Sequence, residues 1–454
     1  MGEAGQRGRL FGTDGVRGVA GFDLTVGLAL DLGVAAAAVL GRADVTDGPR
    51  AVAVIGRDPR ASGPFLEAAV VAGLASAGVD VLRLGVIPTP GVAYLTKALG
   101  ADFGVVISAS HNPARDNGIK FFGRGGVKLP DATEDEIEAE LKAAPRRSTF
   151  FGRVTESGAE QERYVDHLLA TLPTEPRLPL AGLRVVVDCA HGAAYLVAPR
   201  ALRRAGAEVI TIGAEPDGVN INEGCGSTSL EALGATVVTY GADAGIAFDG
   251  DADRCLAVDA DGQPLDGDQI LTVLAAELKE AGRLARDAVV VTVMSNEGFR
   301  VAMREAGIGV IETPVGDKHV SAAMREGGYV LGGEQSGHVI LLEYATTGDG
   351  VLTSLQFLAA VNRRGVSVAA AAAMMRRYPQ VLLNVPGEAS QLGPRVDAAV
   401  SAAESRLAGK GRVLVRPSGT EPAIRLMVQA EDAHLAEVVI GQLADEVRLA
   451  LAGQ

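Results

Sequence analysis

Ala77-Gly78-Val79-Asp80-Val81 is the first of three similar junctions along this sequence. The second is Ala205-Gly206-Ala207-Glu208-Val209, and the third is Ala306-Gly307-Ile308-Gly309-Val310. In each junction a helix-like segment stops at a glycine, which adopts the left-handed conformation of a helix end, and a strand-like run follows at once. This recurrence predicts three related units within one chain.

The segments on either side of these junctions predict further strands. An apolar run precedes each junction, and another apolar run, which ends in polar residues, follows it. The preceding runs are Ala51–Ile55, Leu183–Val187 and Ala288–Val293, and the following runs are Val105–Ser110, Ile246–Asp251 and Tyr329–Ser336. Strand, helix, strand and then a strand ending in a polar loop is the order of a βαβ-based domain. We therefore expect three related mixed α/β domains.

The sequence from about Ala372 onward has a different pattern. Strand-like runs at 381–385, 413–415 and 424–428 lie among helix-like segments at 394–407 and 434–451. Two helices with several antiparallel strands predict a small α+β domain. The expected domains are 1–158, 159–256, 257–371 and 372–454.

The composition predicts a globular protein and argues against two classes of partner. A formal net charge of −14 disfavours nucleic acids and anionic membranes. No apolar stretch reaches the ~18 residues that a membrane span needs. The three cysteines form no CxxC pair, so we expect reduced thiols in a cytoplasmic protein. The 58 glycines exceed average usage and fit many tight loops at strand ends, where sites in α/β proteins usually lie.

Ser110 is the candidate nucleophile. It lies in Ser108-Ala109-Ser110-His111-Asn112-Pro113, directly after an apolar run. A serine hydroxyl attacks only when a base lies near it, and His111, Lys120 and His338 are the candidates for proton transfer. The alternative is a turn serine that caps the next helix. Both roles are compatible, since a helix N-terminus also favours a bound phosphate.

Three aspartates form the candidate metal site. Asp249, Asp251 and Asp253 occupy alternate positions in a loop that follows another apolar run. Such carboxylates can close on one hard cation, and a cation beside a serine points to phosphate chemistry. An EF-hand calcium loop is excluded, because its last ligand position would be Ala260 in place of a glutamate. A hydrated surface turn is the alternative.

A proline- and glycine-rich loop predicts a phosphate clamp. Guanidinium groups, hydroxyls and backbone amides would together surround the anion. The candidate ligands are Arg416, Ser418, Gly419, Thr420 and Arg425. The alternative is a plain turn that joins two strands.

Another loop predicts a sugar site. Glu334 and Ser336 lie two residues apart, so on an extended backbone both side chains point the same way and can bind neighbouring hydroxyls. A buried structural pair is the alternative. Two weaker segments, Phe11–Gly18 and Gly316–His319, each combine glycine turns with a cation, but neither indicates a function in isolation.

Together these loops resemble the signature loops of the α-D-phosphohexomutase superfamily. The matching motifs are SASHNP (108–113), DNGIK (116–120), DGDADR (249–254), GEQSGH (333–338) and RPSGTEP (416–422), in this order. The opening FGTDGVRG (11–18) and the repeats extend the resemblance over nearly the whole chain. It implies three related α/β domains and a C-terminal α+β domain of TATA-binding-protein-like fold around a central cleft.

The resemblance also implies roles for individual residues. Ser110 would carry a phosphoryl group in the active enzyme, and the three aspartates would hold one Mg²⁺ per subunit against it. Lys120 and His338 match positions associated with proton transfer. The implied substrate-binding residues are Arg17, Arg254, His319, Glu334, Ser336, Arg416, Ser418, Gly419, Thr420 and Arg425.

The implied reaction moves a phosphoryl group within a hexosamine phosphate. SASHNP, DGDADR and Gln335 are most similar to the superfamily members that interconvert glucosamine 6-phosphate and glucosamine 1-phosphate through a 1,6-bisphosphate, a step toward amino-sugar nucleotides and cell-wall precursors. Glucosamine or glucose 1,6-bisphosphate would be the activator, and the chain would be a monomer or a homodimer.

Three alternatives stay open. A mutase of the same superfamily that acts on glucose or mannose phosphates would carry the same loops. A regulator that only binds sugar phosphates would have no use for Ser110 and all three aspartates. A Mg²⁺-dependent phosphatase with a nucleophile in the Asp249 loop would keep its hydrolytic activity after Ser110→Ala.

Overall fold

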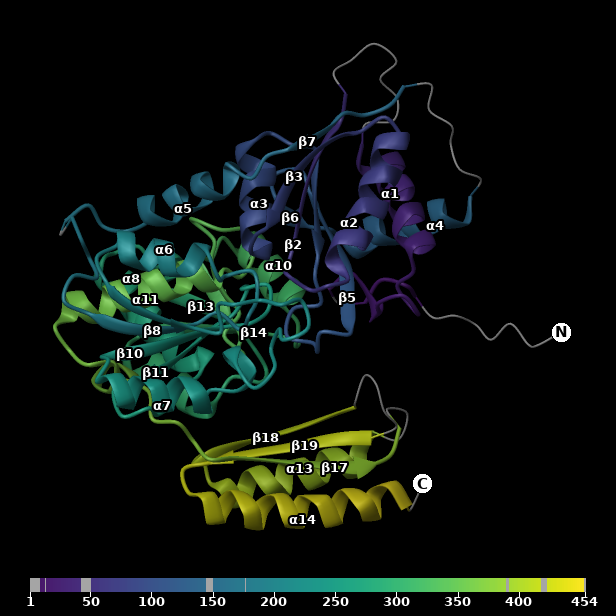
Figure 1. The fold of residues 1–454 in the computed structure, drawn as a ribbon. Helices are drawn as coiled ribbons and strands as arrows, with labels where there is room; N and C mark the ends of the chain where they lie inside the picture. The colour runs from purple at the N-terminus through teal and green to yellow at the C-terminus, as the bar shows by residue number, and fades with distance from the viewer. Residues whose placement is uncertain are drawn as a thin grey trace. The chain divides into compact units, whose positions relative to one another are not determined.

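Residue contacts divide the chain into two compact units, whose elements are drawn in Figure 1. The large unit comprises Met1–Met294 and Gly309–Ala372, and the small unit comprises Ser295–Ile308 and Ala373–Gln454. This computed structural model describes residues 9–12, 14–41, 50–143, 150–175, 177–388, 392–417 and 423–452. Within these ranges, no helix combines the length and the apolar character needed to cross a bilayer.

The large unit contains three copies of one strand topology. In each copy a central strand pairs in parallel with two neighbours, and the later of these pairs antiparallel with the next strand of the chain. The central strands are β2 (Val52–Arg57), β8 (Arg184–Asp188) and β13 (Ala288–Thr292). Their parallel neighbours are β3 (Asp80–Val86), β4 (Phe103–Ile107), β9 (Glu208–Ile212), β10 (Ala244–Phe248), β14 (Gly309–Thr313) and β15 (Leu331–Gly333). The antiparallel strands are β5 (Asp116–Gly123), β11 (Cys255–Asp259) and β16 (Val339–Leu341).

Two crossover helices belong to each copy. They are α2 (Gly63–Ser76) and α3 (Thr89–Ala98), α6 (Val197–Arg204) and α7 (Glu231–Tyr240), and α9 (Glu297–Glu305) and α10 (Asp317–Gly327). The first helix of each pair ends two residues before the glycine of its junction. Gly78, Gly206 and Gly307 have φ values of 92°, 109° and 67°, which glycine adopts freely and other residues avoid. The predicted threefold repeat is therefore confirmed.

Further elements extend the three sheets. The first has seven strands with the addition of β1 (Val16–Val19), β6 (Val127–Lys128) and β7 (Val154–Glu156). The second has five strands with β12 (Pro264–Leu265), and the third has four. The remaining helices of the large unit are α1 (Val26–Leu40), α4 (Asp131–Lys142), α5 (Glu160–Ala170), α8 (Gly267–Glu280), α11 (Gly350–Arg364) and α12 (Val368–Ala372), with short 3₁₀ turns at Gly226–Thr228 and Ala285–Asp287.

The two strands that precede Ser110 and the three aspartates are buried along their whole length. Every residue of β4, with the sequence FGVVI, and of β10, with the sequence AGIAF, is buried. A strand covered on both faces has no polar side, so it forms a continuous apolar run in the sequence. The first places open to polar side chains are the loops at the carboxyl ends of these strands.

The small unit is an antiparallel α+β domain, as the pattern after residue 372 predicted. Its sheet has the order β17-β19-β18, and its two long helices contribute to one core with the sheet. The elements are β17 (Gln380–Pro386), α13 (Pro394–Leu407), β18 (Gly411–Pro417), β19 (Ala423–Ala430) and α14 (Ala433–Ala452).

Helix α9 lies in the small unit, although the strands before and after it belong to the large unit. The Asn296 amide donates to the Tyr378 carbonyl at 3.0 Å, and its oxygen accepts the Tyr378 N–H at 2.9 Å. The Glu297 N–H donates to Gln429 Oε1 at 2.8 Å. The crossover helix of the third repeat is thus a structural part of the C-terminal domain, which the junction motif did not predict.

Gly73 of α2 and Gly33 of α1 form a close helix–helix contact. A Cβ at Gly73 would lie 2.3 Å from the Leu30 carbonyl oxygen, so the backbones would have to separate. We expect Gly73→Ala to lower the free energy of unfolding by about 1–3 kcal/mol. Gly27→Ala in α1 is the control, because its Cβ would meet only Thr25 Oγ1 at 3.9 Å. Urea unfolding measures both, and equal losses would contradict the prediction.

Asp349 is a buried carboxyl at the N-terminus of α11. It accepts the Leu352 N–H at 2.9 Å and the Tyr164 hydroxyl at 2.8 Å. Burial raises the pKa of Asp349 from 3.8 to about 6, so its contribution to stability is complete below pH 3.8 and is lost as the pH rises toward 6.

Asp349→Asn keeps an acceptor for the Leu352 N–H and cannot ionise. We therefore expect the melting temperature of this variant, relative to that of the wild type, to be higher at about pH 7.5 than at about pH 4.5. Thermal scans at the two pH values measure this difference. A difference that does not change with pH would contradict the prediction.

Candidate active site

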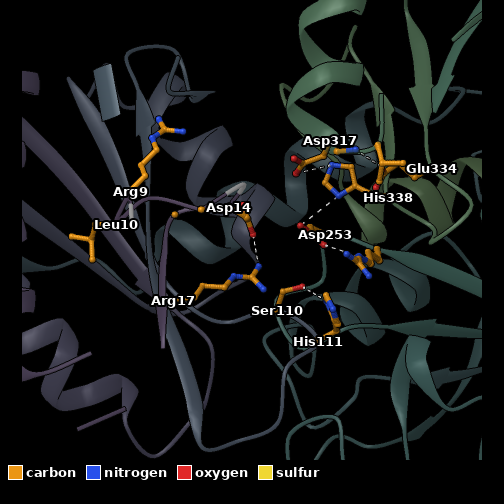
Figure 2. A pocket seen from close by; sticks show the side chains of 15 residues that line it. Arg9, Leu10, Asp14, Arg17, Ser110, His111, Asp253, Asp317, Glu334 and His338 are labelled. Carbon is orange, nitrogen blue, oxygen red and sulfur yellow. Dashed lines mark hydrogen bonds and ion pairs between the residues drawn. The ribbon is translucent and has the colours of Figure 1, made fainter. Parts of the chain in front are cut away.

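Three loops of the large unit border one cavity of about 440 Å³ (Figure 2). Each loop joins the last parallel strand of a repeat to the antiparallel strand after it, namely β4 to β5, β10 to β11 and β15 to β16. The loops carry Ser110, the segment 249–254 and the segment 334–338, so the repeat places three predicted motifs at equivalent positions. The charged and polar lining residues are Arg9, Asp14, Arg17, Ser110, His111, Asp253, Arg254, Asp317, Glu334 and His338.

Ser110 belongs to the first of these loops and contacts the second. Its side-chain hydroxyl donates to Asp249 Oδ2 at 2.6 Å and lies 3.2 Å from His111 Nδ1. Burial, with the charges of Arg254 and Arg17, lowers the pKa of His111 to about 4. The imidazole beside the candidate nucleophile is therefore neutral at physiological pH.

The three predicted metal ligands converge. Asp249, Asp251 and Asp253 are all buried, and each offers one oxygen within 4.8 Å of the others. Burial and the two neighbouring carboxylates raise the pKa of Asp249 well above its usual value. Among the described residues, Oδ1 of Asp251 and Oδ1 of Asp253 have no hydrogen-bond partner. Buried carboxylate oxygens without partners are what a hard divalent cation would satisfy, so this donor set fits a metal ion.

Lys120 is held between two carboxylates. Its Nζ lies 2.6 Å from Asp14 Oδ2 and 2.8 Å from Asp251 Oδ2. Burial opposes the charge, but these carboxylates outweigh it and raise the pKa of Lys120. The side chain is therefore protonated, and its contact with Asp251 joins the loop of the three aspartates to the first repeat.

His338 faces Asp253 from the third repeat. Its Nδ1 lies 3.4 Å from Asp253 Oδ2, and its Nε2 accepts the Gly348 N–H at 3.1 Å. Burial opposes protonation, but Asp253 and Asp317 raise the pKa of His338. Protonation of Nε2 would cost the bond from Gly348, so this bond and the two carboxylates favour different protonation states of the ring.

Only some of the residues predicted to bind the substrate line the cavity. Glu334 lines the cavity, and its Oε1 accepts the Gly316 N–H at 3.1 Å. Ser336 and His319 do not belong to the lining. The Ser336 hydroxyl lies 3.5 Å from Glu334 Oε2, the outer limit of a hydrogen bond. Arg17, which donates to Asp14 at 2.5 Å, belongs to the lining.

Sequence reasoning did not select Asp14, Lys128 and Asp317. Lys128 pairs with both acids, at 3.2 Å from Asp14 Oδ1 and in a shorter contact with Asp317. Burial opposes ionisation of Asp14, but Lys120, Lys128 and Arg17 hold its pKa well below the usual value. The two acids lie in the motifs FGTDGVRG and GDKH, which carried a weak signal, whereas Lys128 carried none.

The predicted phosphate clamp belongs to the small unit. Arg416 of β18 and Arg425 of β19 are direct partners in the antiparallel register. Burial and the charge of Arg425 lower the pKa of Arg416. Two cations opposite each other on a sheet destabilise it unless an anion joins them. Ser418, Gly419 and Thr420 lie outside the described residues.

Sequence models of one family match almost the whole chain. The phosphoglucomutase/phosphomannomutase models for alpha/beta/alpha domains I, II and III match residues 8–147, 162–262 and 266–378. The model for the C-terminal domain of that family matches residues 367–446.

Solved structures share this fold. A phosphoglucomutase/phosphomannomutase family protein of Burkholderia thailandensis superposes with a TM-score of 0.81 at 24% identity, over 97% of both chains. The N-acetylphosphoglucosamine mutase of Aspergillus fumigatus, in complex with GlcNAc-6P and magnesium, superposes with a TM-score of 0.65 at 19% identity, over 97% of this chain and 96% of its own.

Full-length relatives are much more similar in sequence. The phosphoglucosamine mutase of Thermobifida fusca is 62% identical, over 97% of this chain and 98% of its own. That of Streptomyces griseus is 58% identical, over 98% of this chain and 100% of its own. The chain belongs to the phosphoglucomutase/phosphomannomutase family and, within it, groups with the phosphoglucosamine mutases.

Proposed function

We propose that this chain interconverts glucosamine 6-phosphate and glucosamine 1-phosphate through a phosphoserine at Ser110. The observation that carries the proposal is the 2.6 Å bond from Ser110 Oγ to Asp249, within a buried cluster of three aspartates at a cavity lined by Arg17 and Arg254. A nucleophile joined to a candidate cation site, with guanidinium groups beside it, is the equipment of phosphoryl transfer.

Mg²⁺, one per subunit, is the proposed cofactor. Asp249, Asp251 and Asp253 would hold it together with the phosphoryl group on Ser110. When bound, it would withdraw negative charge from the phosphoryl group in transfer. The magnesium in the A. fumigatus structure supports this assignment.

The proposed reaction has two transfers. In the first, the C1 hydroxyl oxygen of glucosamine 6-phosphate forms a bond to phosphorus while the bond from phosphorus to Ser110 Oγ breaks. The hydroxyl gives its proton to a base, and the leaving Oγ takes one up. The 1,6-bisphosphate then turns around, and Ser110 takes the phosphoryl group from C6, which leaves glucosamine 1-phosphate.

Proton carriers and substrate ligands follow from the same proposal. Lys120 is one proposed proton carrier, and Asp14 and Asp251 favour its protonated form. His111 and His338 are the other proposed proton carriers. Arg17, Arg254, His319, Glu334 and Ser336 are proposed to contact the reacting phosphate or the sugar, and Arg416, Ser418, Gly419, Thr420 and Arg425 the non-reacting phosphate.

The wider setting is also proposed. Glucosamine or glucose 1,6-bisphosphate would restore the phosphoserine after its loss. The chain would act in the cytoplasm, as a monomer or homodimer, and supply amino-sugar nucleotide and cell-wall precursor synthesis. We keep the proposed domain boundaries, which follow residues 158, 256 and 371.

Phosphorus-31 NMR distinguishes the candidate reactions. With Mg²⁺ and a trace of glucose 1,6-bisphosphate, we expect a 1-phosphate signal to grow fastest from glucosamine 6-phosphate. Faster growth from glucose 6-phosphate or mannose 6-phosphate would keep the chemistry and overturn the substrate. Release of inorganic phosphate alone would overturn the mutase reaction.

Ser110→Ala tests the nucleophile in the same assay. We expect it to abolish turnover, because no other group would carry the phosphoryl intermediate. Ser405→Ala, at an exposed position of α13, is the control and should keep full activity. A Ser110→Ala variant that still hydrolyses sugar phosphates would indicate a phosphatase with an aspartate nucleophile.

A further inference from the structure

The backbone of Ser110 has an unusual conformation. Its φ of 51° lies in the left-handed region, which residues other than glycine rarely adopt. Such a conformation persists at functional sites only where the surroundings impose it. Because φ sets the direction of the Cα–Cβ bond, whatever imposes this angle also aims the hydroxyl at Asp249.

Buried side chains hold the N–H side of Ser110. Its N–H donates to Ser108 Oγ at 3.0 Å, and the Ser108 hydroxyl donates in turn to Asp58 Oδ2 at 2.5 Å. Asp58 and Ser108 are fully buried. The amide of the candidate nucleophile is therefore fixed to the loop that follows β2.

Two side chains, a guanidinium and an amide, donate hydrogen bonds to the carbonyl oxygen of Ser110. Arg60 Nη2 donates to the Ser110 carbonyl oxygen at 2.9 Å and to that of Asn112 at 2.8 Å. Asn222 Nδ2 donates to the same two oxygens, at 2.9 Å and 3.1 Å. Arg60 is fully buried, and its Nε donates to Asp58 Oδ2 at 2.9 Å. One guanidinium thus connects Asp58, which anchors the N–H side of Ser110 through Ser108, to the Ser110 carbonyl oxygen.

The metal-binding loop packs against the same carbonyl. A Cβ at Gly250 would lie 2.5 Å from the Ser110 carbonyl oxygen and 3.0 Å from Asn222 Nδ2. The position of this oxygen therefore sets the distance between the Ser110 loop and the aspartate loop. Asn222 comes from the second repeat and Arg60 from the first, so the two donors fix the nucleophile with respect to both.

The geometry points to Arg60 and Asn222 as positioning residues for phosphoryl transfer by Ser110. Neither lines the cavity, so they act through the backbone of the nucleophile and not on the sugar phosphate. This inference rests on the proposed function, and it adds two residues that the sequence motifs did not indicate. It requires that their loss slow the transfer and leave sugar-phosphate binding unchanged.

Asn222→Gly is the decisive variant. Asn222 itself has a φ of 60°, which glycine adopts freely, so this change removes the amide and keeps the turn. We expect kcat to fall about 10- to 100-fold, because a nucleophile displaced by less than the length of a covalent bond already reacts much more slowly. The KM for glucosamine 6-phosphate should stay unchanged. Asn220→Gly is the matched control. The Asn220 amide donates to the Glu215 carbonyl oxygen in the same loop and not to Ser110, so we expect this variant to keep the wild-type kcat.

Arg60→Lys tests the second donor. Lysine keeps the charge opposite Asp58 but lacks the planar fork, whose two ends donate to the carbonyl oxygens of Ser110, Asn112, Pro113 and Asp116. We expect the same loss of kcat at constant KM, and slower phosphorylation of Ser110 by glucose 1,6-bisphosphate in a rapid-quench experiment read by mass spectrometry. Arg83→Lys is the control, because Arg83 pairs with Glu67 instead.

The outcomes separate this inference from the proposed function. A wild-type protein without mutase activity would overturn the proposed function itself. An active wild type with Asn222→Gly at wild-type kcat would overturn the positioning role, and would show that only the turn at Asn222 matters. Losses in kcat at unchanged KM and melting temperature, confined to the Arg60 and Asn222 variants, would support it.

Discussion

Three aspartate carboxylates buried within 4.8 Å of one another repel, and the surrounding structure has to compensate them. Lys120 neutralises Asp251, and His338 faces Asp253, yet one oxygen of each of these acids stays without a hydrogen bond among the described residues. A divalent cation would complete the balance. Lys128 and Arg17, which pair with Asp14, extend the network of opposite charges to the first repeat.

The threefold repeat explains how side chains with different chemical functions come to line one cavity. Each copy ends its parallel strands in a loop at the same topological position, and each loop contributes different side chains: a serine and histidine, an aspartate cluster, or a glutamate and histidine. The scaffold is therefore general, and specialisation is confined to short segments. This division agrees with the usual location of sites at the carboxyl ends of strands in open α/β sheets.

The sequence was sufficient to predict the repeat and most of the polar residues that the three loops place at the cavity, but Ser336 lies outside its lining. Buried strands form apolar runs, junction glycines with positive φ are hard to replace, and carboxylates at alternate positions are conspicuous, so each left a local signal. The Lys128 contacts had no such signal, because its partners Asp14 and Asp317 are 114 and 189 positions away. The packing of α9 with Tyr378 and the bonds from Asn222 to Ser110 likewise depend on tertiary structure alone.

The membership of α9 in the small unit has a consequence for dissecting the protein. The chain passes between the units after Met294, after Ile308 and after Ala372, so the C-terminal domain is not a simple appendage. A chain truncated at Ala372 would keep α9 but lose Tyr378 and Gln429, and the buried polar groups at the start of that helix would lose their partners. The two units are interleaved in sequence, and neither can be excised by a single cut.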